Sequence, residues 1–169
     1  MGCEPRDIIR AAGIVNASIS DGPGLRLTVF AQGCERDCPG CHNPDTHDLN
    51  GGYDLNISDI VELYKQNKLL DGVTLSGGEP FLQPAALCAL AREIKALGGN
   101  VVTYTGYTFE ELLKKDDCRE LLALTDILID GPFELAQRTL ELPFRGSANQ
   151  RALDVVRSLA AGEAAEKNL

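Results

Sequence analysis

Three cysteines stand within eight residues, and their spacing is the feature of this sequence most able to do chemistry. Cys34, Cys38 and Cys41 form the pattern C-x3-C-x2-C. Disulfide pairing would leave one thiol over, and a closed structural zinc site needs four ligands. His42 or His47 could supply the fourth, although His42 adjoins Cys41 and would need an unusual loop geometry. An iron–sulfur cluster held by three thiolates would instead leave one iron free of protein ligands, as a catalytic centre requires.

The residues around the cysteines favour a tight loop at the end of a strand. Gly33, Pro39 and Gly40 suit a loop that wraps a bulky group and lets backbone amides approach it. The preceding stretch LRLTVFAQG, residues 25–33, predicts a buried strand that ends at the first cysteine. If His47 is not a ligand, we expect it to be a surface residue.

A second glycine-rich segment, SGGEP at 76–80, follows another short β-rich stretch. Residues 72–76, GVTLS, predict a strand, and Pro84 suits the first position of a helix that ends at Gly98. On its own, SGGEP could be a plain turn that leads into this helix. Its position after a strand makes a ligand-binding loop the competing interpretation.

Strands and helices alternate along the chain, which predicts an α/β fold with a parallel sheet. The predicted strands are residues 25–33, 72–76, 100–105 and 126–130, and the last predicted helix is 150–159. Each strand ends in a polar or glycine-rich segment, and ligands of parallel α/β folds bind at these ends. Because a complete eight-fold barrel needs roughly 200 residues or more, we expect an open, partial (β/α) barrel with parallel strands.

Composition and charge limit the function classes. The 169 residues suit a single compact domain, 1–169, in which we expect residues 160–169 to fray. The formal net charge of −9 argues against a nucleic-acid surface as the main function. No apolar stretch approaches the ~20 residues of a membrane span, and the N-terminus lacks a signal-peptide pattern. We therefore expect a cytoplasmic protein, in which grouped thiols bind metal more often than they pair.

Six segments of the chain, taken in order, resemble the radical S-adenosylmethionine superfamily. They are DGPGLRLTVFAQGC, CPGCHNPDT, LSGGEP, TYTGYT, LIDGPF and FRGSANQR. Together they resemble the activating proteins of anaerobic (class III) ribonucleotide reductase and, more broadly, the glycyl-radical-enzyme activases. Many relatives have Tyr where this chain has His42, and some have Asp where it has Glu79. These departures leave the chemistry intact and leave the partner open.

The resemblance implies that Cys34, Cys38 and Cys41 bind a 4Fe-4S cluster. The methionine part of S-adenosylmethionine would chelate the fourth iron. The residues implied to contact this cofactor are Gly40, Cys41, His42 and Gly78, and the further candidates are Ser76, Gly77, Glu79 and Thr105. Glu79 would add negative charge near the ammonium group of the ligand. No side chain is assigned a catalytic role, because the cluster and S-adenosylmethionine would carry the chemistry.

The resemblance also implies an oxidoreductase that installs a glycyl radical on a partner enzyme. Cleavage of S-adenosylmethionine would give methionine and a 5′-deoxyadenosyl radical, which takes hydrogen from a glycine of the partner. The expected partner is the large subunit of anaerobic ribonucleotide reductase, with a one-electron donor such as reduced flavodoxin. The alternatives are another glycyl radical enzyme or a peptide as the target, and, from another class, a non-catalytic zinc-binding interaction module.

Three other cysteines and two loops have open roles. Cys3 is near a terminus, and we expect Cys88 and Cys118 to be helix residues rather than ligands. The segment DGPG, residues 21–24, could be a turn, or could lie near the active site or the partner surface. The segment FRGSANQR, residues 144–151, could bind adenosine, receive the partner's glycine loop, or cap the last helix.

Overall fold

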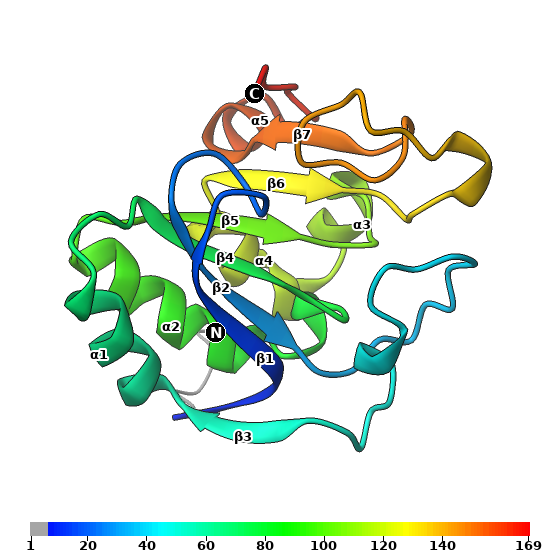
Figure 1. Ribbon diagram of the computed structural model, residues 1–169. Coiled ribbons are helices and arrows are strands. Elements are labelled where there is room, and N and C mark those ends of the chain that lie inside the picture. Colours follow the sequence, from blue (N-terminus) through cyan, green and yellow to red (C-terminus); the bar gives the residue numbers. More distant parts are fainter. Residues whose placement is uncertain (1–6) are drawn as a thin grey trace.

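The computed structural model describes residues 7–169, so Cys3 lies outside the described residues. Its strands are β1 (Ile8–Ser18), β2 (Arg26–Ala31), β3 (Tyr53–Asn56), β4 (Gly72–Gly77), β5 (Asn100–Tyr104), β6 (Ile127–Asp130) and β7 (Arg151–Asp154). They form one open sheet in the order β3-β1-β2-β4-β5-β6-β7 (Figure 1). The four central strands, β2, β4, β5 and β6, are parallel. The edge strands β1, β3 and β7 pair antiparallel.

The α/β prediction is confirmed, and the parallel arrangement holds for the four strands that the sequence predicted. The prediction of parallel strands throughout is wrong at both edges of the sheet. Strand β1 was not predicted, because its sequence IIRAAGIVNAS alternates weakly and most of it is only partly buried. The helix predicted at 150–159 is wrong in its first part, since residues 151–154 form β7 and the helix begins at Val155.

The helices cover one face of the sheet (Figure 1). They are α1 (Ile57–Gln66), α2 (Pro84–Ala96), α3 (Phe109–Leu113), α4 (Arg119–Leu124) and α5 (Val155–Ala161). Leu87 and Ile94 of α2 pack with Leu27 of β2 and Leu75 of β4 in the main hydrophobic core. Cys88 and Cys118 are buried in this core. Within residues 7–169, no helix is long and apolar enough to cross a membrane.

The opposite face of the central strands is more polar. Side chains alternate along a strand, so Thr28 and Thr74 point away from the helices. The guanidinium of Arg26, fully buried on this face, donates hydrogen bonds to Thr74 Oγ1 at 2.6 Å and to the carbonyl of Val73 at 2.8 Å. It also donates to the carbonyl of Pro23 at 3.0 Å, which holds the connection between β1 and β2 against the sheet.

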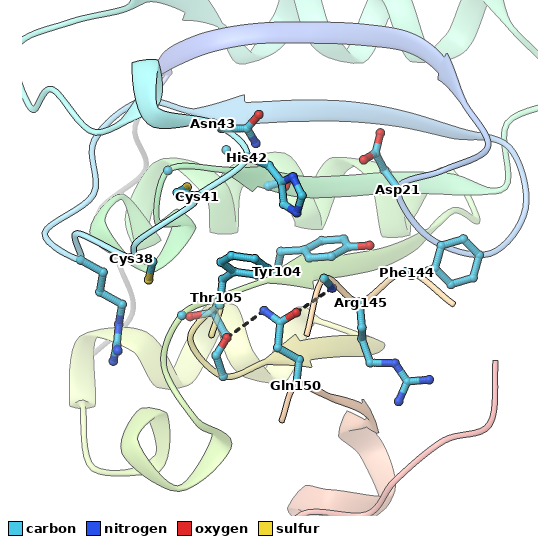
Figure 2. A pocket seen from close by; sticks show the side chains of 18 of the residues that line it. Asp21, Cys38, Cys41, His42, Asn43, Tyr104, Thr105, Phe144, Arg145 and Gln150 are labelled. Atoms are coloured by element: carbon cyan, nitrogen blue, oxygen red, sulfur yellow. Dashed lines mark hydrogen bonds between the residues drawn. The ribbon is translucent and has the colours of Figure 1, made fainter. Parts of the chain in front are cut away.

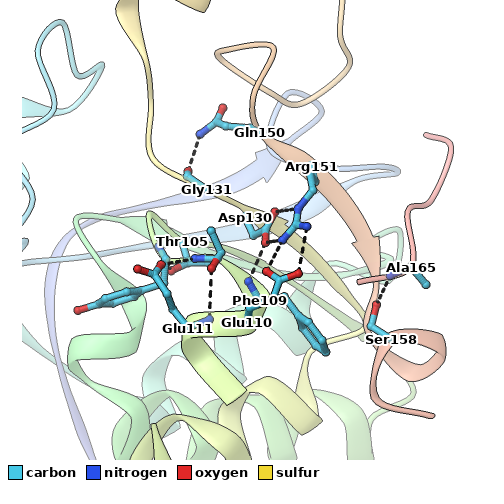
Figure 3. Close-up of polar contacts among 12 residues, drawn as sticks. Thr105, Phe109, Glu110, Glu111, Asp130, Gly131, Gln150, Arg151, Ser158 and Ala165 are labelled. Atoms are coloured by element: carbon cyan, nitrogen blue, oxygen red, sulfur yellow. Dashed lines mark hydrogen bonds and ion pairs between the residues drawn. The ribbon is translucent and has the colours of Figure 1, made fainter. Parts of the chain in front are cut away.

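The C-terminal segment that we expected to fray pairs with the edge of the sheet. The amide of Lys167 donates to the carbonyl of Ala152, and the amide of Asp154 donates to the carbonyl of Ala165. Ser158 Oγ accepts a further hydrogen bond from the amide of Ala165 (Figure 3). These contacts give the backbone of β7 partners on its outer side.

A buried carboxylate fixes the end of β6 (Figure 3). Asp130 is 1% exposed and accepts hydrogen bonds from the amide of Phe109 at 2.8 Å and from Arg151 Nε at 3.0 Å. Arg151 also pairs with Glu110, and this hydrogen bond lowers the pKa of the Glu110 carboxyl. A capping box begins α3, with Thr108 as its first residue. The ends of β6 and β7 and the start of α3 are thereby held together.

Replacing Arg151 by Met should lower the free energy of unfolding by about 3 kcal/mol, because the buried Asp130 carboxylate loses its cationic partner. Urea unfolding followed by circular dichroism measures this loss. Lys65→Met is the matched control, since Lys65 pairs with Glu62 on the surface and its loss should cost less than about 0.5 kcal/mol. Equal stabilities of the two variants would contradict this account of Asp130.

Candidate functional site

One cavity of about 880 Å³ lies at the carboxyl ends of the parallel strands. Two long connections enclose it: the cysteine loop, residues 32–52 between β2 and β3, and the 131–150 segment between β6 and β7 (Figure 1). Its wall includes nine of the ten predicted site residues: Cys34, Cys38, Cys41, His42, Ser76, Gly77, Gly78, Glu79 and Thr105. Segments far apart in sequence therefore meet at the carboxyl ends of the strands, as the alternation of strands and helices predicted.

Gly40 is the predicted site residue that does not line this cavity. Its φ of +74° needs glycine, and a Cβ there would lie 2.9 Å from a methyl carbon of Leu135. Gly40 therefore packs the cysteine loop against the 131–150 segment. The contact between Gly40 and the cofactor that the resemblance implies has no counterpart in this cavity wall.

The three cysteines of the loop are free thiols, half-buried, on one wall of the cavity. A turn brings the second and third together, since the amide of Cys41 donates to the carbonyl of Cys38 at 3.1 Å. Burial raises the pKa of the Cys34 thiol. Within residues 7–169, no three His, Cys, Asp or Glu side chains converge closely enough to hold a single metal ion. Three soft thiol donors facing a roomy cavity do suit a cluster that is larger than one ion.

The glycines of SGGEP are required by the protein's own backbone. A Cβ on Gly77 would lie 2.4 Å from the backbone of Ala31, and one on Gly78 would lie 2.3 Å from the carbonyl oxygen of Gly33. The amide of Glu79 donates to that same carbonyl at 2.8 Å. The end of β4 therefore packs directly against the start of the cysteine loop, which explains both glycines without a ligand.

Glu79 has a role that the sequence did not indicate. Its carboxylate is 2% exposed and accepts hydrogen bonds from the amides of Phe81 and Gly106 and from the hydroxyl of Thr105, at 2.8–3.1 Å. Burial raises its pKa, and the hydrogen bond from the Gly106 amide is the largest opposing effect. Glu79 thus joins the end of β4 to the end of β5, and the hydroxyl of Thr105 donates its hydrogen bond to this carboxylate.

Arg36, between the first two cysteines, ties the cysteine loop to the segment after β5. Its guanidinium lies 4.7 Å from the ring centre of Tyr107 and 3.5 Å from the carboxylate of Glu111. Lys115 lies near the same ring, 5.0 Å from its centre. These contacts cross between distant segments, and no local spacing signals them.

Figure 2 shows Cys38 and Cys41 toward one end of the cavity and Asp21 and Arg145 toward the other, with Tyr104 between them. Asp21, the first residue of DGPG, is fixed by hydroxyl donors from Ser18 at 2.5 Å and Thr28 at 3.2 Å. Burial, and secondarily the nearby Asp21, raises the pKa of Tyr104. Its phenol therefore stays neutral at physiological pH and can donate a hydrogen bond.

The 131–150 segment is held by amide side chains of FRGSANQR. Gln150 accepts from the amide of Gly146 at 2.8 Å and donates to the carbonyl of Gly131 at 3.1 Å (Figure 3). The hypothesis that this motif caps the last helix is wrong, because Asp154 caps α5. Phe144 has a φ of +61°, a left-handed conformation that costs energy in a residue other than glycine. This strained residue lines the cavity beside Arg145.

Replacing Glu79 by Gln should lower the free energy of unfolding by about 2 kcal/mol. Whichever way the amide is placed, its NH₂ group faces a backbone N–H, of Phe81 or of Gly106, that the carboxylate now accepts. Urea unfolding measures the loss, and Glu62→Gln on the surface is the control. A variant as stable as the control would show that Glu79 does not hold the two strand ends together.

Comparisons with known proteins give the family. The model of the 4Fe-4S single cluster domain matches residues 20–153. The anaerobic ribonucleoside-triphosphate reductase-activating protein of Vibrio cholerae is 36% identical over 141 residues, which cover 78% of this chain and 89% of that protein. Its namesake in Escherichia coli K12 is 33% identical over 144 residues, with 78% and 90% covered.

Two further matches are more partial. The pyruvate formate-lyase-activating enzyme of Clostridium pasteurianum is 39% identical over 127 residues, which cover 70% of this chain and 52% of that enzyme. The crystal structure of QueE from Escherichia coli aligns with 60% of this chain and 53% of that chain, at 16% identity and a TM-score of 0.45. On the family model and the near-full-length relatives, this chain belongs to the family of anaerobic ribonucleoside-triphosphate reductase-activating proteins, built on a 4Fe-4S single cluster domain.

Proposed function

We propose that this chain is a radical S-adenosylmethionine activase that generates a glycyl radical on a partner enzyme. The observation that supports this most is the shared cavity: the C-x3-C-x2-C cysteines and SGGEP form one wall at the carboxyl ends of parallel strands. Family membership gives the same answer, because the near-full-length relatives are named as reductase-activating proteins. In this proposal the open sheet is the partial barrel of a radical S-adenosylmethionine core, and residues 1–169 are one domain.

Cys34, Cys38 and Cys41 would hold the cluster, and the methionine part of S-adenosylmethionine would occupy the iron that they leave free. Held by these cysteines, a 4Fe-4S cluster would supply one-electron reduction of S-adenosylmethionine, which gives methionine and a 5′-deoxyadenosyl radical. His42 and the strand-end residues that line the cavity (Ser76, Gly77, Gly78 and Thr105) would surround the cosubstrate. Because Glu79 is buried and already accepts three hydrogen bonds from the protein, we assign it to positioning rather than to direct contact.

The other residues of the cavity would bind, orient and exclude water. The neutral phenol of Tyr104, in the middle of the cavity, can donate a hydrogen bond to the bound molecule. Asp21 and Arg145 offer one charge of each sign at the end away from the cysteines. The 131–150 segment covers the cavity with apolar side chains, and Leu140 among them is 91% exposed.

The partner we propose is the anaerobic ribonucleoside-triphosphate reductase, since the near-full-length relatives carry its name. A second candidate is pyruvate formate-lyase, because its activating enzyme from Clostridium pasteurianum is 39% identical over 127 residues. The electron would come from a one-electron donor such as reduced flavodoxin, and the reaction would take place in the cytoplasm. The competing non-catalytic function is a zinc-binding interaction module built on the same cysteines.

Anaerobically purified protein should be brown and contain about four iron and about four sulfide per chain. With a reductant it should convert S-adenosylmethionine to 5′-deoxyadenosine, as measured by chromatography. Colourless protein with one zinc per chain and no cleavage would contradict the proposal and support the interaction module.

Cys38→Ala should lose most of the iron and all cleavage of S-adenosylmethionine, because two thiolates cannot hold the cluster. Cys88→Ala is the matched control: Cys88 is buried in α2, away from the cavity, and its loss should leave iron content unchanged. Iron analysis and cleavage assays measure both variants. Full cleavage by the Cys38 variant would remove this residue from the site.

A further inference from the structure

His47 occupies a fixed position beside the cysteines, although its sequence position suggested a surface residue. It follows the 3-10 turn Pro44–Thr46, and its amide donates to the carbonyl of Pro44 at 3.2 Å. Its own carbonyl accepts from the amide of Cys34 at 3.2 Å, and the preceding carbonyl, of Thr46, accepts from the amide of Gly33 at 2.7 Å. The backbone of His47 is therefore attached to the start of the cysteine loop at the end of β2.

The side chain of His47 reaches the third cysteine. Its Nε2 lies 3.3 Å from Cys41 Sγ, and the half-buried imidazole lines the same cavity. His42, the other histidine, instead packs its ring edge against Phe133, with ring centres 5.2 Å apart. His47 thus contacts the first cysteine through its backbone and the third through its ring, so it holds both ends of the segment from Cys34 to Cys41.

The direction of this hydrogen bond follows from the chemistry of a bound thiolate. A cysteine sulfur that holds iron has no proton, so it can only accept. The nitrogen 3.3 Å away must then be the donor, with its proton on Nε2. A hydrogen bond to a ligand sulfur stabilises the more negative, reduced state of a cluster, and such bonds are among the determinants of cluster potential.

We propose that His47 is a positioning residue that donates a hydrogen bond to the Cys41 thiolate and raises the reduction potential of the cluster. This inference rests on the proposed function, since it requires a cluster on the three cysteines. It makes His47 a residue that eases electron entry without ligating iron. A cluster with a more positive reduction potential is also a weaker reductant. The same hydrogen bond would therefore limit how strongly the reduced cluster can reduce its cosubstrate.

The test compares wild type, His47→Phe and His47→Gln, each loaded with iron and sulfide under anaerobic conditions. Phenylalanine keeps an aromatic ring of similar size and removes the donor. Glutamine places an amide N–H near the position of imidazole Nε2, so it is the matched variant that keeps the donor. The readouts are iron and sulfide content and the midpoint potential, from a redox titration followed by EPR.

We expect all three proteins to hold the cluster. His47→Phe should shift the reduction equilibrium about tenfold toward the oxidised form, which is about 59 mV for a one-electron couple. His47→Gln should recover most of that shift. A role in folding alone would change cluster content and not the potential of the clusters that remain.

An unchanged potential in a fully loaded His47→Phe protein would overturn the inference while leaving the proposed function standing. Loss of iron from both variants would also overturn it, because His47 would then be a ligand or a structural residue. If the wild-type chain itself takes up no cluster, the proposed function fails first, and the inference fails with it.

Discussion

The buried carboxylate of Glu79 joins the two strand ends on which the cavity is built. The carboxylate accepts hydrogen bonds from the backbone amides of Phe81 and Gly106. The backbone amide of Glu79 donates to the carbonyl of Gly33, at the start of the cysteine loop. A charge so far removed from water is tolerated only when donors surround it. The ends of β2, β4 and β5 are therefore fixed relative to one another. This also fixes the start of the cysteine loop, which follows β2.

A second buried carboxylate, Asp130, does the same at the other side of the cavity. It holds the start of α3 and the first residue of β7 at the end of β6. The two long connections, residues 32–52 and 131–150, line the cavity that these strand ends support. The two carboxylates therefore hold the strand ends at both sides of the cavity, and the residues that line it lie on connections attached to those ends.

The sequence predicted the central part of this arrangement well. Strands that alternate with helices along the chain predict a parallel sheet. Because the carboxyl ends of parallel strands lie at one edge of the sheet, the loops that follow these four strands were expected to meet there. The edges of the sheet were not predictable in this way: β7 has four residues, Arg151–Asp154, and runs directly into a helix, so one apolar pattern covers both. The roles of Glu79, Arg36 and His47 depend on contacts between segments that are distant in sequence. The spacing of residues along the chain does not predict such contacts. Gly77 and Gly78 were singled out as candidate ligand contacts, and the structure adds a backbone packing requirement for both that the sequence did not indicate.

The central claim is that this chain installs a radical on a glycine of its partner. The most direct measurement is EPR on an anaerobic mixture of the cluster-loaded chain, S-adenosylmethionine, a reductant and anaerobic ribonucleoside-triphosphate reductase. We predict a glycyl radical signal on the reductase that is absent when S-adenosylmethionine is omitted. A chain that cleaves S-adenosylmethionine, yet yields no such signal with the reductase or with pyruvate formate-lyase, would contradict the claim.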